Sequence, residues 1–416
     1  MGGVTSGPGV SCVSDAVLLA RAFLSRVAEP ASIPVWGFVR DVGAVAAVAA
    51  IRDGSAPERV VRATQPRRDR IDPHADLEAA ERHGLRLVVP ESDEWPHFAF
   101  AALEHAGAAR YRRFDRGETS ISESGEPMPP LALWVAGVGD LATLGVRSVG
   151  IVGARAATAY GEHVTADLGY GLARRGLVVV SGGAYGIDAV AHRSALAAEG
   201  QTVVVSAGGL DRPYPPGNAS LFDRSRETGL LVSESPPGAA PQRHRFLTRN
   251  RLIAALSTGT VVVEAAVRSG AANTAGHCFA LGRPVMAVPG PVTSPMSAGC
   301  HVLLRRDPSP ALLVTSVADV LAVVGAIGEA GETSPPGAVP DVRAELDALD
   351  PVARRVFDGM PARRPARPDE IAQRSGVSPI EVIRSLPVLD LAGLIEASDA
   401  GYRIAARLRT PRSRSG

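Results

Sequence analysis

The chain has 416 residues, of which 45% are hydrophobic and 21% are charged, and its formal net charge is only +1. This composition is typical of a globular protein with two or three domains and excludes a disordered or fibrous chain. A net charge so close to zero also means that any nucleic-acid site must be a local cluster of basic residues, because the field of the whole protein will not attract phosphate.

All 44 basic residues are arginines. The absence of lysine excludes a P-loop lysine, a Schiff-base lysine and a nucleotidyl-lysine intermediate. Cys12, Cys278 and Cys300 are too scattered for a disulfide framework or a metal site, so we expect no metal and no cofactor. The sequence shows no signal peptide and no apolar run long enough to cross a bilayer, which predicts a cytoplasmic protein without a membrane partner.

The N-terminal region, residues 1–115, is predicted to be a helical domain of the SAM or helix-hairpin-helix kind. Its Ala-rich segments, such as DAVLLARAFLSRV and GAVAAVAAIRDG, are separated by Pro and Gly, as expected for short helices. The polar stretch DRGETSISESGEPMPP follows, and it predicts a linker and entry segment over residues 116–144.

Residues 145–325 alternate short β-branched runs with amphipathic segments of helical length. Continuous apolar strands flanked by helices predict an α/β domain, a Rossmann-like, doubly wound and mostly parallel sheet with helices on both faces. Six strands are predicted, at about 149–153, 177–181, 202–206, 230–233, 260–264 and 284–288.

A second Pro- and Gly-containing stretch predicts another linker over residues 326–342. The order of helix, turn, helix and hairpin in residues 343–405 then predicts a C-terminal winged helix. The arginine-rich end of the chain, residues 406–416, is predicted to be a disordered tail.

Two Gly-rich loops follow consecutive predicted strands. In an open parallel sheet, ligands bind beyond the carboxyl ends of the strands, where Gly-rich turns let backbone N–H groups approach an anion. Neither loop has the spacing or the acidic residue of a dinucleotide fingerprint. We therefore predict that both loops contact phosphate, with the guanidinium group of Arg155 binding two phosphate oxygens. The predicted residues are Gly153, Ala154, Arg155, Ser181, Gly182, Gly183 and Gly186.

The segment PQRHRFLTRNRLIAALS is the strongest basic cluster of the sequence. Its guanidinium groups and its one aromatic ring suit a single nucleic-acid strand, with bases stacking on the ring. A further nest of small donors follows the fifth predicted strand, which ends in Glu264; we expect this carboxylate to orient arginine side chains. These two segments add Arg243, Arg245, Phe246, Arg249, Arg251, Ser269, Gly270 and Thr274 to the predicted nucleic-acid site.

In their order and spacing, the motifs VGARAATAYG, SGGAYGIDAVAHRSAL, LVSESPPGAAPQRHRFLTRNRLIAALS, VVEAAVRSGAANTA and GRPVMAVPG resemble the DNA-processing protein A (DprA/Smf) family. The resemblance implies a single-stranded DNA-binding protein that is not an enzyme. It also implies that the chain forms a homodimer, protects incoming strands and helps load RecA recombinase in natural transformation. By this resemblance the strand contacts Gly153, Arg155, the second Gly loop and the run Arg249, Asn250 and Arg251.

Two other functions remain open at this stage. The same broad fold includes nucleoside-monophosphate phosphoribohydrolases, whose catalytic Glu would have Glu264 as its nearest counterpart here, although the Pro-Gly-Gly loop of those enzymes is missing. Alternatively, the winged helix could read duplex DNA. Its presumed recognition helix, SPIEVIRSLPVL, is poorly equipped for this, and a protein-contact role fits that helix better.

Overall fold

The computed structural model describes residues 13–118, 125–326, 346, 349–361, 364–398, 400–405 and 408. The chain divides into two compact units, Met1–Glu332 and Thr333–Gly416, each with its own hydrophobic core.

The first unit is built on a nine-stranded sheet with the order β1-β2-β6-β5-β4-β3-β7-β8-β9. All pairs from β6 to β9 are parallel, whereas β1 and β2 are antiparallel to their neighbours. The strands are β1 (Leu85–Val88), β2 (Leu133–Gly137), β3 (Ser148–Gly153), β4 (Val178–Ser181), β5 (Thr202–Ser206), β6 (Leu230–Ser233), β7 (Thr260–Val263), β8 (Val285–Ala287) and β9 (Leu312–Leu313). All six predicted strands are confirmed, as is the Rossmann-like fold class.

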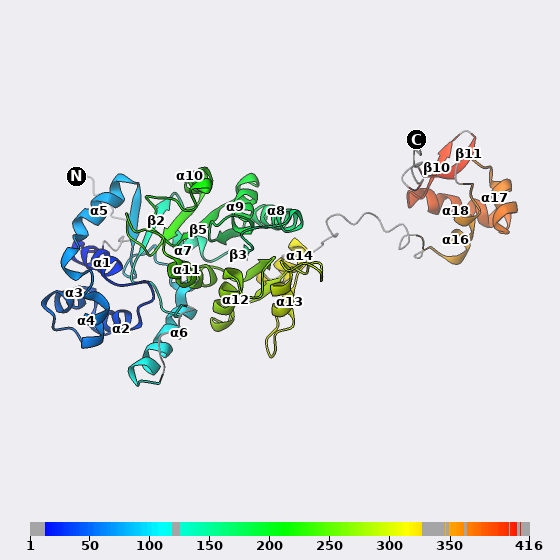
Figure 1. Cartoon of the computed structure of the whole chain (residues 1–416). Coiled ribbons are helices and arrows are strands. Elements are labelled where there is room, and N and C mark those ends of the chain that lie inside the picture. Colours follow the sequence, from blue (N-terminus) through cyan, green and yellow to red (C-terminus); the bar gives the residue numbers. More distant parts are fainter. Residues whose placement is uncertain are drawn as a thin grey trace, which may run out of the picture. The chain divides into compact units, whose positions relative to one another are not determined.

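Helices cover both faces of this sheet, as Figure 1 shows. Alternate residues of a strand point to opposite faces, so Val178 and Val180 of β4 join one core and Val179 joins the other. One layer contains α8 (Ala159–Ala173), α9 (Ile187–Ala197), α10 (Ala219–Thr228) and α14 (Val317–Val324). The other contains α6 (His97–Asp115), α11 (Arg243–Ala255), α12 (Gly270–Ala280) and α13 (Ala298–Leu304), with the short α7 (Leu141–Leu144) beside α6.

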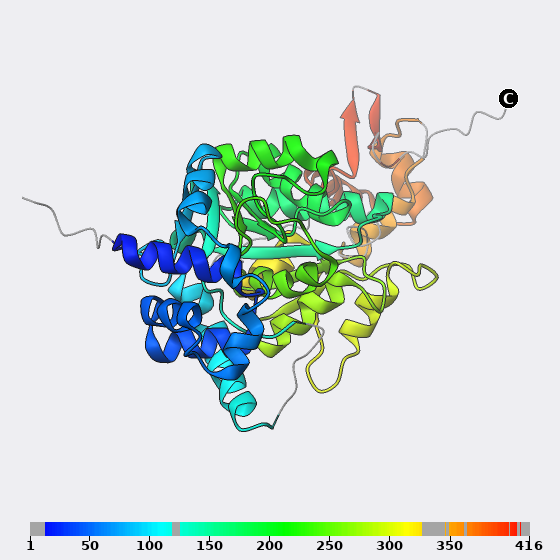
Figure 2. The same cartoon turned by 60° about the vertical axis from the view of Figure 1, so that its left-hand side comes forward.

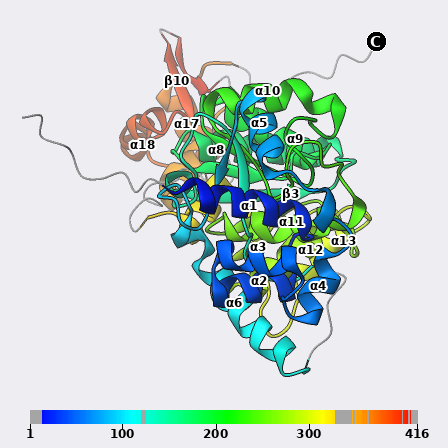
Figure 3. The same ribbon diagram turned by 90° about the vertical axis from the view of Figure 1, so that its left-hand side faces the viewer.

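Short N-terminal helices form a small core of their own and gather at one side of the unit in Figures 2 and 3. They are α1 (Asp15–Val27), α2 (Ile33–Val42), α3 (Ala44–Asp53) and α4 (Glu58–Thr64), whereas α5 (Pro73–Arg82) packs through Ala80 on β1, β2 and β6 of the sheet. The sequence predicted helices up to residue 115 and a linker after it, with no strand in either part. In the structure this region also supplies β1 and β2, so it is joined to the core through a shared sheet.

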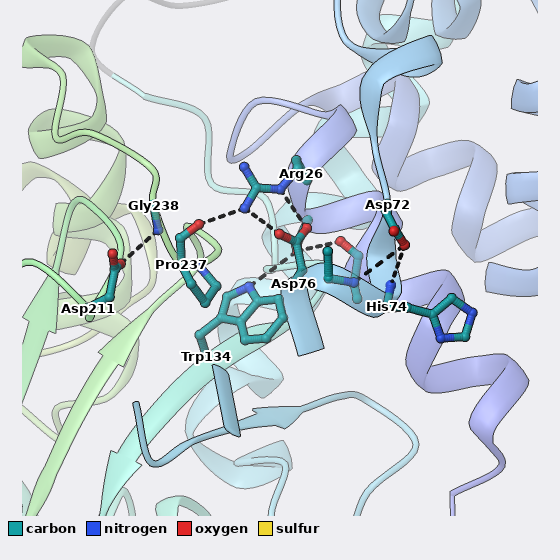
Figure 4. A network of polar contacts seen from close by, with 11 residues as sticks. Arg26, Asp72, His74, Asp76, Trp134, Asp211, Pro237 and Gly238 are labelled. Carbon is teal, nitrogen blue, oxygen red and sulfur yellow. Dashed lines mark hydrogen bonds and ion pairs between the residues drawn. The ribbon is translucent and has the colours of Figure 1, made fainter. Parts of the chain in front are cut away.

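Polar contacts of β2 and α1 tie the N-terminal helices to the core (Figure 4). The indole Nε1 of Trp134, a fully buried residue of β2, donates to Ser25 Oγ at 3.2 Å. Arg26 forms a bidentate pair with Asp76 of α5, both distances being 2.5 Å, and also donates to the carbonyl oxygen of Pro237 at 2.6 Å. The loop before α11, which contains Pro237, is therefore hydrogen-bonded to helix α1 of the N-terminal region.

Glu29 is the second polar link between these regions. Its carboxylate accepts from Arg245 at 2.8 and 3.0 Å, from Arg67, and from His244 at 3.2 Å. Partial burial alone would raise the pKa of Glu29, but the hydrogen bonds from Arg245, Arg67 and His244 outweigh it and lower the pKa to about 2. The link thus requires an ionised carboxylate.

The second unit has the predicted winged-helix order. It contains α16 (Pro351–Asp358), α17 (Pro368–Ser375), α18 (Pro379–Leu391) and the antiparallel hairpin of β10 (Ile395–Ser398) and β11 (Gly401–Ile404). Most of the predicted second linker and tail, residues 327–342 and 406–416 except Leu408, lies outside the described residues.

Within the described residues, no single helix is long and apolar enough to cross a membrane. The helices α2 and α3 reach the required length and hydropathy only as a pair, and they are bent by 119°.

We predict that Glu29→Gln lowers the free energy of unfolding of the first unit by about 1 kcal/mol at pH 6. The expected effect is this small because the carboxylate is partly exposed and its ion pairs are screened by water. Because the folded-state pKa lies below that of the unfolded chain, the stabilisation is complete above the ordinary value of 4.5 and is lost as the pH falls toward about 2. Urea unfolding at pH 6 and pH 3 measures this, and the difference between wild type and variant should shrink at pH 3. Glu58→Gln, which removes an exposed pair with Arg62, is the control and should change little.

Candidate nucleic-acid interface

An open cleft of about 880 Å³ lies at the carboxyl ends of the parallel strands. The loops after β3, β4 and β7 and the beginning of α11 line it. Strand order reverses at β3, since β4 lies on one side of it and β7 on the other, and ligands of open α/β sheets bind at this kind of switch point. Its lining includes ten predicted residues: Gly153, Ala154, Arg155, Arg243, Phe246, Arg249, Asn250, Ser269, Gly270 and Thr274.

Two glycines of the first two loops allow the loops to approach each other closely. A Cβ on Gly153 would lie 1.9 Å from the carbonyl oxygen of Val263. Gly186 has a φ of 74°, and a Cβ there would lie 2.3 Å from the carbonyl oxygen of Ala154. These glycines therefore set the positions of the loops, and Arg155, which is exposed, extends from the first loop into the cleft.

The second Gly loop is packed tightly against its neighbours. Ser181 is fully buried and its Oγ donates to the carbonyl oxygen of Ile151 at 2.6 Å. Gly183, with a φ of 69°, packs against Phe222. The structure does not place Ser181, Gly182, Gly183 or Gly186 in the lining of the cleft. The Ser181 hydroxyl and the absence of a side chain at the glycines serve packing, and phosphate contacts of this loop through its backbone N–H groups stay a prediction.

Arg249 connects this loop to the cleft. Its side chain is buried, and Nη1 donates to the carbonyl oxygens of Gly182, at 2.8 Å, and Val205. Burial lowers the pKa of Arg249 to about 10, against the opposing effect of the Asp188 carboxylate. Burial also raises the pKa of Asp188, while Arg249 acts in the opposite direction. At neutral pH the guanidinium remains charged and contributes a fixed positive charge to the cleft wall.

Aromatic rings lie beside the guanidinium groups. The Cζ atoms of Arg155 and Arg249 are 5.4 and 5.9 Å from the ring centroid of Phe246, within the range of cation–π attraction. The half-exposed Tyr214 ring lies 5.7 Å from Phe246, centroid to centroid. Tyr214 was not among the predicted residues, although it lies in the Pro-rich loop after β5, at the same edge of the sheet.

The loop after β7 forms the opposite wall of the cleft. Ser269 caps α12 by accepting from the backbone N–H of Ala272, and Thr274 donates to the carbonyl oxygen of Gly270 at 3.2 Å. Asn250 donates to that same carbonyl at 3.2 Å and to Asn273 Oδ1 at 3.0 Å, so its amide joins α11 to α12. The N-terminus of α12, with its positive end of the helix dipole, therefore faces the cleft.

Three exposed arginines of the cleft make no ion pair with any described residue: Arg155, Arg243 and Arg268. Arg268 was missed because it stands alone in the loop VRSGAANTA rather than in a basic run. Among the described lining residues Asp188 is the one carboxylate, and it is buried near Arg249. The cleft therefore combines an excess of positive charge with exposed aromatic surface.

Two predicted arginines do not reach the cleft. Arg251 is 0% exposed and forms a bidentate pair with Glu234, both distances being 2.6 Å. It also donates to the carbonyl oxygens of Met128, at 2.7 Å, and Thr248, at 3.1 Å. Arg245 is bound to Glu29. Guanidinium groups held in this way are not free to bind a phosphate, so the structure contradicts the predicted phosphate contacts of Arg245 and Arg251.

The prediction that Glu264 orients arginine side chains is wrong. Glu264 is buried at a φ of 53°, and its carboxylate accepts from the backbone N–H of Thr158 at 2.9 Å and from the Thr158 hydroxyl. A Cβ on Gly161 would lie 2.3 Å from the same carboxylate. Glu264 thus fixes the beginning of α8.

A family model described as DNA recombination-mediator protein A matches residues 119–325, and a model described as DprA winged helix domain matches residues 340–401. The putative DNA processing protein DprA of Mycobacterium tuberculosis is 50% identical over 392 residues, which cover 94% of this chain and 95% of that protein. Protein Smf of Escherichia coli is 37% identical over 278 residues, covering 66% of this chain and 71% of its own length.

Among solved structures, the X-ray structure of DNA processing protein A from Streptococcus pneumoniae matches with a TM-score of 0.58 and 29% identity. The match covers 74% of this chain and 98% of that chain.

We predict that replacing two arginines of α11 has very different effects on the stability of the first unit. Arg251→Met should destabilise the first unit by about 3–5 kcal/mol, because it leaves Glu234 buried without its partner. Arg243→Ala should leave stability within about 0.5 kcal/mol of wild type, since its side chain is exposed. Urea unfolding of both variants tests the assignment, and equal stability of the two would contradict it.

Proposed function

Because the chain belongs to the DNA-processing protein A (DprA/Smf) family, as its motifs predicted, we propose that it binds single-stranded DNA in the cleft without cutting it. The observation that carries this proposal is the juxtaposition of three arginines without an ion pair to any described residue, Arg155, Arg243 and Arg268, with the ring pair Phe246 and Tyr214.

In this proposal the three exposed cleft arginines bind the phosphates of the strand. Guanidinium forks bind phosphate oxygens bidentately, and here no described carboxylate competes for them. The fixed charge of Arg249 and the N-terminus of α12 add attraction for the polyanion. This local cluster is sufficient although the net charge of the chain is only +1.

The bases of the strand stack on the rings of Phe246 and Tyr214. Stacking on aromatic rings is open to every base, because every base has a flat face, and it requires bases that are free of a duplex. Arginine, glycine and aromatic contacts read the backbone and the base faces rather than base edges, so we expect little sequence preference.

The same geometry argues against the phosphoribohydrolase alternative. The counterpart of a catalytic carboxylate, Glu264, is buried and occupied by Thr158. Asp188, which does line the cleft, is buried near Arg249 and accepts from the N–H of Ala184 at 3.4 Å. Neither carboxylate is placed to act on a bound nucleotide, which supports binding without catalysis.

Arg155→Ala tests the cleft directly. We expect it to weaken binding of a dT oligomer about tenfold, the loss of one charge-assisted contact. The slope of log affinity against log salt should become less steep by about 0.7, because one phosphate fewer is neutralised.

Fluorescence anisotropy at several salt concentrations provides the measurement. Arg174→Ala, at an exposed site beyond the other end of α8, is the matched control and should bind as wild type does. Unchanged affinity and slope in Arg155→Ala would place the strand elsewhere.

We further propose, from the family resemblance, that the chain is a cytoplasmic homodimer that protects incoming single strands and helps load RecA recombinase on them in natural transformation. The wild-type chain should then shorten the delay before RecA hydrolyses ATP on a strand already covered by single-strand-binding protein. Arg155→Ala should lose this effect and Arg174→Ala should retain it. A wild-type chain that binds the strand but leaves the delay unchanged would contradict the RecA role alone.

A further inference from the structure

A further exposed ring lies beyond the aromatic pair of the cleft. Tyr185, at the end of the second Gly loop, is 50% exposed and directly follows Ala184, which lines the cleft. Its ring packs against the backbone of Gly217, where an added Cβ would lie 2.7 Å from Oη of the tyrosine and 3.1 Å from Cε1. Gly217 follows Tyr214 by three residues, which span about 11 Å at most. Tyr185 is therefore close to Tyr214 on the surface.

The turn that carries Gly217 is fixed by one buried amide. Asn218 is 1% exposed, and its Nδ2 donates to the carbonyl oxygens of Gly183, at 3.0 Å, and Ala184, at 3.2 Å. Its Oδ1 accepts from Arg193 of α9 at 3.3 Å. This single side chain joins the second Gly loop to α9, so the tyrosine at the end of that loop and Arg193 belong to the same small region of the protein.

Arg193 has the properties of a phosphate-binding residue. It is exposed, and it forms no ion pair with any residue that the structure describes. The hydrogen bond to Asn218 occupies only one of its two Nη groups. A guanidinium group near an exposed ring is also the combination that Arg155 and Phe246 form in the cleft. The first group suits a phosphate and the second suits the face of a base.

We propose that a single strand bound in the cleft continues past Tyr214, stacks a further base on Tyr185 and places a neighbouring phosphate on Arg193. This extension rests on the proposed function, because it needs a strand that already occupies the cleft. Since Tyr185 is held against Gly217 before binding, its ring loses little freedom when a base stacks on it. The added subsite lengthens the bound segment of the strand and adds no sequence preference, because every base can stack.

A length series of dT oligomers tests the ring in the full-length chain. Oligomers of about 4 to about 16 nucleotides span the site sizes of OB-fold domains. We expect Tyr185→Ala to weaken binding of the longest oligomers about tenfold, the loss of one stacked base, and to leave the shortest, which the cleft alone holds, unchanged. Tyr185→Phe keeps the ring and should bind every length as wild type does. Tyr170→Ala, at a tyrosine of α8 that is 48% exposed, is the matched control and should also change nothing.

The salt dependence of the same series tests the arginine. Arg193→Gln removes the charge and keeps an amide donor for Asn218. For the longest oligomers, the slope of log affinity against log salt should become less steep by about 0.7, because one phosphate fewer is neutralised. The shortest oligomers should keep the wild-type slope. Arg174→Gln, at an exposed position beyond the end of α8, is the control and should keep the wild-type slope at every length.

Two results would overturn the extension. One is wild-type binding of the longest oligomers by Tyr185→Ala. The other is an equal loss of affinity at every length, which would make Tyr185 part of the cleft itself. Arg155→Ala separates these results from a failure of the proposed function, because it should weaken binding at every length. If Arg155→Ala weakens binding and Tyr185→Ala does not, the strand occupies the cleft and ends there.

Discussion

A buried guanidinium fixes the elements that form the proposed nucleic-acid cleft. Placing the charge of Arg249 in the protein interior is unfavourable unless its donors and its charge are matched. The carbonyl oxygens of Gly182 and Val205 accept hydrogen bonds from its N–H groups, and the Asp188 carboxylate opposes its charge. The carboxyl ends of β4 and β5 are thereby fixed to α11. Phe246, one turn earlier on α11, stands beside this guanidinium, so the position of the aromatic ring depends on the same interaction.

The arginines of α11 have different structural roles. Along α11, Arg243 is exposed in the cleft, Arg245 binds the N-terminal helices through Glu29, and Arg251 is enclosed with Glu234. Guanidinium is suited to all three because it stays charged when buried and can meet a carboxylate with two parallel hydrogen bonds. A run of basic residues is thus mostly structural here. The binding surface is completed by Arg155 and Arg268 from two other loops.

Much of the fold could be predicted from the sequence, because buried parallel strands are continuous apolar runs of β-branched residues, as in LVVVSGG around β4. The strands β1 and β2 were missed because they lie among helices and polar loops, outside the alternation of strands and helices that marks the parallel core. For the site, spacing along α11 could not distinguish the exposed Arg243 from Arg245 and Arg251, since the last two are held by Glu29 and Glu234, whose places in space the sequence does not show. Tyr214 and Arg268 carried no local signal and are brought to the cleft only by the topology of the sheet.

The antiparallel strands β1 and β2 also determine what the N-terminal region does for the core. β2 covers the hydrogen-bonding edge of β6 along its whole length, from Trp134 opposite Ser233 to Gly137 opposite Leu230. A chain that began at the first parallel strand would leave the backbone N–H and C=O groups of Leu230–Ser233 open to pairing with other chains, and would expose apolar residues that β2 now covers. The helices that precede the core are thus joined to two strands that cover its β6 edge, and the parallel core depends on them.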